Sequence, residues 1–172
     1  VAQIDAALRE HGAALIVRHA SAREAIPALA AELVAQAVFC GRDDEPEALA
    51  RDAAVERALR QDGRALRTVK EHMIFERDEV LTAQGKPYSV FTPYRTAWLA
   101  RYAAQPQQPV DSAVTFARLA ALPVALQQPL PTLSELGFAP SNLHELKLPL
   151  GASGAAALVD DFSRRLDDYD QA

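Results

Sequence analysis

Apolar residues occur in two different patterns over the first 70 residues of the chain. Short, mostly apolar segments occupy residues 13–17, 37–40 and 65–69. Segments of this length are typical of parallel strands that are covered on both faces. Between them, residues 24–34 and 46–62 carry apolar side chains at helical spacing. The alternation predicts an α/β fold, a Rossmann-like parallel sheet with helices on both faces.

Glycine and proline mark the ends of the predicted helices. Residues 1–10 have helical spacing and are followed by Gly12, a residue type that commonly ends helices. The next helix is predicted to begin near Glu24, because an earlier start would place Pro27 too deep in the helix. Pro46 suits the first position of the third helix, where a proline loses no hydrogen bond.

Residues 71–102 separate this alternating part from a later part of the chain that has a different composition. Thr92 is predicted to cap a helix whose first residue is Pro93. One face of this helix carries most of its aromatic side chains, and that face is formed by Tyr94, Ala97, Trp98, Arg101 and Tyr102. Such a face is expected to be buried, so the segment is interpreted as a hinge between two halves of a larger protein.

The remaining chain divides into a proline-rich passage and one more helix. Residues 103–150 hold seven of the eleven prolines and several glutamines, so little regular structure is expected. Within them, Thr132 and Glu135 have capping-box spacing before Gly137, which predicts a single helical turn. After Ser153, a predicted N-cap, an apolar helical stripe is formed by Leu158, Val159, Phe162, Leu166 and Tyr169.

Length and charge limit the functions that this chain can carry. With 172 residues, one domain plus an appendage is expected. A net charge of -5 gives no broad basic surface for nucleic acid. The single cysteine, Cys40, fits a reducing compartment, and no apolar run approaches the ~18 residues of a membrane span. Because residues 1–10 are amphipathic rather than a signal peptide, a cytoplasmic location is expected.

Common nucleotide and metal motifs are absent from the sequence. Neither G-x-G-x-x-G nor G-x-x-x-x-G-K-[ST] occurs, which argues against a nucleotide-binding α/β module, the most distant alternative for this chain. The four histidines lack the spacing of metal ligands, so no metal site is predicted.

Several segments, in order along nearly the whole chain, resemble the DNA photolyase/cryptochrome family. Residues 85–94, GKPYSVFTPY, are followed by an Ala-Trp pair at 97–98. The strand and loop at 38–46, the motifs at 50–56 and residues 133–138 also match. The resemblance implies that residues 1–102 are the latter part of the α/β antenna domain, 103–150 the interdomain linker, and 151–172 the first helix of the FAD-binding helical domain.

The resemblance also implies that the family's first strands would precede residue 1 and that most of the FAD domain would follow residue 172. A sheet without those strands would have unpaired edges. The isolated chain is therefore expected to be marginally stable or to self-associate.

The function implied by the resemblance is that of deoxyribodipyrimidine photolyase, an enzyme that repairs cyclobutane pyrimidine dimers in DNA under blue light. Reduced FAD would supply an electron to a dimer that is flipped out of damaged DNA and bound by the helical domain. This segment would then be a structural and light-harvesting part without catalytic residues. The nearer alternative is a cryptochrome, which uses the same scaffold for signalling without repair.

Four residues match cofactor positions of the family. Tyr169 corresponds to a tyrosine near the flavin phosphates. Asp43, Glu45 and Arg51 correspond to residues that hold the antenna chromophore in deazaflavin-binding members, although a solvated acidic loop would have the same sequence. In folate-binding members an asparagine and a glutamate occupy positions 47 and 48, which are Glu and Ala here. A deazaflavin, or no antenna chromophore, is therefore favoured over a folate.

Overall fold

The computed structural model describes residues 1–106, 108 and 113–166, and the chain divides into two compact units. One unit combines Val1–His19 with Asp111–Ala172, and the other is Ala20–Val110. The domain boundaries expected from the family resemblance stay predictions. Among the described residues, no helix combines the length and the apolar character needed to cross a membrane.

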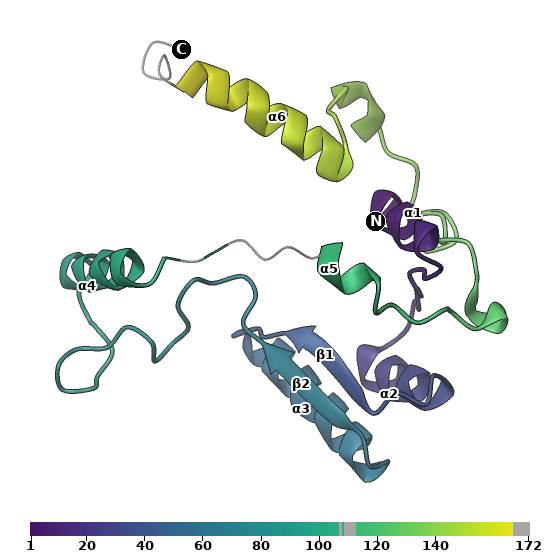
Figure 1. Cartoon of the computed structure of the whole chain (residues 1–172), viewed down its shortest axis with the longest axis horizontal. Helices are drawn as coiled ribbons and strands as arrows, with labels where there is room; N and C mark the ends of the chain where they lie inside the picture. Colours follow the sequence, from purple (N-terminus) through teal and green to yellow (C-terminus); the bar gives the residue numbers. More distant parts are fainter. Residues whose placement is uncertain (107, 109–112, 167–172) are drawn as a thin grey trace. The chain divides into compact units, whose positions relative to one another are not determined.

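The unit Ala20–Val110 contains the parallel sheet that the sequence predicts. Strands β1 (Ala37–Gly41) and β2 (Ala65–Val69) pair in parallel, with Ala37 opposite Ala65. Helix α3 (Pro46–Gln61) connects them and packs against both β2 and helix α2 (Ala22–Glu32), as Figure 1 shows. An incomplete α/β fold of the Rossmann-like kind is thereby confirmed.

The core of this unit lies between the sheet and its two helices. Leu59 is only 1% exposed and packs with Val55 and Ala30. Partly buried apolar side chains surround this cluster, namely Ile26, Ala35, Val38 and Leu66. Because successive strand residues point to opposite faces, Phe39 lies on the other side of the sheet, where it is 71% exposed.

The strand predicted at residues 13–17 does not form. This segment follows helix α1 (Ala2–Glu10), and its backbone pairs with no strand in the described structure. The N–H of Leu15 instead donates to Oδ1 of the buried Asp5, at 2.8 Å. A strand needs a neighbour for its backbone groups, whereas here a side chain supplies the acceptor.

Asp5 makes the anchoring of this segment sensitive to acid. Hydrogen bonds from Arg9 and, more weakly, from the Leu15 N–H lower the pKa of Asp5. A carboxyl group with a lowered folded-state pKa stabilises the fold at neutral pH, and that contribution is lost as the pH falls through the lowered value. We expect the hydrogen-exchange protection factor of the Leu15 amide to decrease once the pH is lowered past about 4. Asp5→Asn should remove this pH dependence, and unchanged protection down to pH 2 would contradict the assignment.

Two helix starts differ from the sequence predictions. Helix α2 begins at Ala22 rather than near Glu24, and Pro27 lies inside it. The helix tolerates this proline, which removes only one backbone donor. Helix α4 (Phe91–Ala104) begins before the predicted cap, Thr92, so Pro93 is its third residue. A proline there still falls among the first four N–H groups, which have no partner within a helix.

The aromatic face predicted on α4 packs against the chain that precedes it. Trp98 meets the ring of Phe75 edge-on at 5.4 Å between centroids and stacks on Tyr102 at the same distance. Phe75 is 8% exposed, and the guanidinium of Arg101 lies 5.1 Å from its ring centre. These contacts attach α4 to the segment that precedes it in the same unit.

The second unit contains α1 and the elements after residue 112. These elements are the helix α5 (Ala113–Phe116), the short 3₁₀ turns η1 (Val124–Leu126) and η2 (Leu143–Leu146), and the helix α6 (Gly151–Arg165). The predicted capping box is confirmed, since the N–H of Glu135 donates to Thr132 Oγ1 at 3.2 Å and Glu135 Oε2 accepts the N–H of Thr132 at 2.7 Å. Ser153 does not cap α6 as predicted. It lies within the helix and accepts a hydrogen bond from Gln3.

Candidate functional site

A hollow lies where β1 ends and α3 begins. The chain turns there through residues 42–45, and Pro46 starts α3 as its first residue. In an open α/β sheet, ligands bind beyond the carboxyl ends of the strands, so the location is one where a ligand site is expected. The hollow has a volume of about 590 Å³, within the range typical of small-molecule sites.

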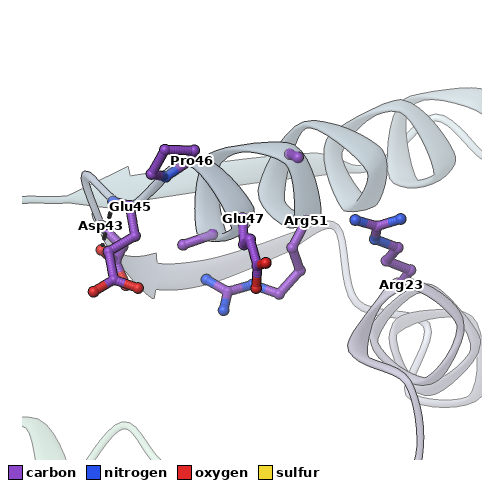
Figure 2. A pocket seen from close by; sticks show the side chains of 8 residues that line it. Arg23, Asp43, Glu45, Pro46, Glu47 and Arg51 are labelled. Atoms are coloured by element: carbon purple, nitrogen blue, oxygen red, sulfur yellow. Dashed lines mark hydrogen bonds between the residues drawn. The ribbon is translucent and has the colours of Figure 1, made fainter.

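Charged side chains dominate the lining of this hollow, which we call the β1–α3 pocket. Figure 2 shows the carboxylates of Asp43, Glu45 and Glu47 along the start of α3, Arg51 one turn further, and Arg23 reaching from α2. The full lining consists of Arg23, Asp43, Glu45, Pro46, Glu47, Ala48, Ala50 and Arg51. The three residues predicted from the sequence, Asp43, Glu45 and Arg51, therefore surround one pocket.

Asp43 is held in place by the loop backbone. Its Oδ1 accepts the N–H of Glu45 at 3.0 Å, drawn as a dashed line in Figure 2. This hydrogen bond lowers the pKa of Asp43, and a second one from the backbone N–H of Asp44 and the nearby charge of Arg51 add to the effect. Asp43 is therefore ionised at neutral pH, and its remaining lone pairs can accept hydrogen bonds from a ligand.

Arg51 is oriented by its neighbour on α3. Its Nε donates to Asp52 Oδ1 at 2.8 Å, and this bond is the main cause of a raised pKa for the guanidinium. The fork of an arginine carries five N–H donors, so the bond to Asp52 leaves others available. Arg51 can thus donate to carbonyl or anionic oxygens of a ligand in the pocket.

Three charged groups of the pocket have no hydrogen-bond or ion-pair partner among the residues that the structure describes. Within the described part of the chain, the side chains of Arg23, Glu45 and Glu47 make no hydrogen bond or ion pair. The pocket thus presents both carboxylate acceptors and guanidinium donors, a combination that suits a polar ring system with groups of both kinds.

Sequence reasoning missed Arg23 as a pocket residue. It lies on α2, about twenty residues before the loop, and reaches the pocket only because α2 packs beside α3. No local pattern indicates this packing. The other predicted cofactor residue, Tyr169, lies outside the described residues, so its role near a flavin stays a prediction.

Comparison with known proteins gives the family. Residues 1–112 match the family model described as DNA photolyase, which covers well over half of the chain. The chain belongs to the DNA photolyase family. Recognition of the family from residues 85–98 and the loop at 38–46 is thereby confirmed.

Curated relatives match over most of the chain. A deoxyribodipyrimidine photo-lyase of Halobacterium salinarum is 35% identical over 172 residues, covering 95% of this chain and 34% of the relative. A second photo-lyase, from a Synechococcus species, is 30% identical over 94% of this chain and 34% of its own length. An uncharacterised 31.6 kDa protein of another Synechococcus strain is 35% identical over 92% of this chain and 54% of its own length. The chain thus spans about a third to a half of these relatives.

Proposed function

We propose that this chain is the light-harvesting and structural part of a deoxyribodipyrimidine photolyase, which repairs cyclobutane pyrimidine dimers. The main support is that two relatives named as photo-lyases match more than nine-tenths of the chain. The charged pocket at the carboxyl end of β1 adds a site in which an antenna chromophore could bind. Damaged DNA would be bound by other segments of the complete protein, in keeping with the net charge of -5 here.

The chemical step would depend on FAD. When bound, reduced FAD would supply one electron to the dimer and would recover it after the ring has split. The described residues include none that the family resemblance assigns to FAD, so this part of the chain would contribute no catalytic group. Its contribution would be to collect light and to hold the antenna chromophore.

A deazaflavin fits the groups that line the β1–α3 pocket. The carboxylates of Asp43, Glu45 and Glu47 can accept hydrogen bonds from ring N–H or side-chain hydroxyl groups. The guanidinium groups of Arg23 and Arg51 can donate to ring carbonyl oxygens. A volume of about 590 Å³ accommodates a three-ring chromophore.

Repair activity is the first test. The complete protein that carries this chain, reconstituted with reduced FAD, should split thymine dimers in a synthetic oligonucleotide under blue light and leave them intact in the dark. Product can be measured as recovery of absorbance at 260 nm. A protein that binds FAD and absorbs blue light but never splits the dimer would support the cryptochrome alternative instead.

A further inference from the structure

The loop that carries Asp43 and Glu45 divides its side chains between two hollows. Asp43 and Glu45 line the β1–α3 pocket, whereas Arg42 and Asp44 line a second hollow of about 360 Å³. This alternation is expected of an extended backbone, in which successive side chains point in opposite directions. Contacts that fix the side chains of Arg42 and Asp44 therefore also affect how the side chains of Asp43 and Glu45 face the pocket.

Two ion pairs join the residues that line the second hollow. Its other wall is formed by residues 76–79, between β2 and α4. Nε of Arg77 donates to Asp44 Oδ1 at 2.5 Å, and the guanidinium of Arg42 pairs with Glu76. The two ion pairs lie on either side of Asp43 in the sequence, so they fix the loop at two points.

Hydrogen bonds of Glu79 stabilise the segment formed by residues 76–79. Oε2 of Glu79 accepts the N–H of Glu76 at 2.7 Å and the ammonium group of Lys70 at 2.5 Å. These bonds, the one to Lys70 first, lower the pKa of Glu79, which therefore stays ionised at neutral pH. The loop is thus paired with a segment that is itself held by hydrogen bonds.

We propose that Glu76 and Arg77 are positioning residues for the β1–α3 pocket. Neither lines that pocket. By holding Arg42 and Asp44 on the outer side of the loop, they keep the carboxylates of Asp43 and Glu45 turned inward. The inference rests on the proposed antenna function for the ligand, but the order of the loop can be measured without any ligand.

The test uses charge reversal and charge exchange in the complete protein. Arg77→Asp removes one ion pair and sets a carboxylate against Asp44, whereas Arg77→Asp combined with Asp44→Arg restores opposite charges. Arg60→Asp is the matched control, because Arg60 pairs with Glu56 on the exposed side of α3, away from the loop. Hydrogen exchange of residues 42–47 reports the loop, and fluorescence titration with 5-deazariboflavin reports the pocket.

Arg77→Asp should raise exchange in residues 42–47 and weaken deazariboflavin binding by roughly three- to tenfold, as expected for a partly exposed pair converted to a repulsive one. The double variant should recover most of both effects, and Arg60→Asp should show neither. Unchanged loop exchange in Arg77→Asp, or faster exchange with unchanged affinity, would overturn the proposal. If the unmutated protein does not bind deazariboflavin, the antenna assignment fails, and the recovery of loop exchange in the double variant still decides whether the ion pairs order the loop.

Discussion

Leu59→Ala is expected to destabilise the sheet-containing unit by about 2–5 kcal/mol. Leu59 has the lowest exposed fraction in the core, 1%, and contacts residues from both helices of that core. Truncation removes apolar contacts and leaves a cavity, because the surrounding strands and helices relax only partly. Residues Val38 and Leu66 on the strands would lose part of their packing partner.

Hydrogen exchange of the β1 and β2 amides in the complete protein measures this effect on the unit itself. Leu49→Ala is the matched control, since Leu49 lies on the same helix and is 39% exposed. That change should cost clearly less than Leu59→Ala, because Leu49 buries less apolar surface and alanine favours the helix. Equal losses in the two variants would show that the core lies elsewhere.

The sequence predicted those elements whose signals are local. Strands β1 and β2 and the helix α3 follow from the lengths of their apolar segments and from Pro46 at the first helical position. The segment 13–17 has an equally strong apolar pattern, yet it forms no strand. Pairing depends on a neighbouring strand, and no local pattern tells whether one is present.

Helix boundaries depended on competing local rules. Pro27 was expected to exclude an earlier start of α2, but the helix begins at Ala22 and includes it. Packing of Ile26 and Ala30 against α3 favours the longer helix and offsets one missing hydrogen bond. These tertiary contacts, which no sequence window contains, stabilise a helix that includes Pro27.

The candidate site was predictable only where its residues are close in sequence. Asp43, Glu45 and Arg51 follow one strand and share one loop and the first turns of one helix, so their meeting around a pocket follows from the fold. Arg23 and Arg77 come from other elements, and charge alone did not distinguish them from the other basic residues of the chain. Ligand binding by the predicted residues stays a prediction.

Arg51→Glu is expected to weaken binding of 5-deazariboflavin by about tenfold or more. The change removes a donor whose charged hydrogen bonds are typically worth 1.5–3 kcal/mol, although partial exposure reduces that figure here. It also adds a fourth carboxylate to a wall that already holds Asp43, Glu45 and Glu47. Repulsion among these groups would favour a protonated or displaced side chain over a bound chromophore.

The measurement is a fluorescence titration of the complete protein from which bound pigment has been removed. Arg57→Glu is the control, because it makes the same charge change at an exposed position of α3 that does not line the pocket. Arg51→Lys should give an intermediate affinity, since lysine keeps the charge but lacks the planar fork that donates to two oxygens at once. If Arg51→Glu and Arg57→Glu weaken binding equally, the effect is one of overall charge, and Arg51 has no direct role in holding the chromophore.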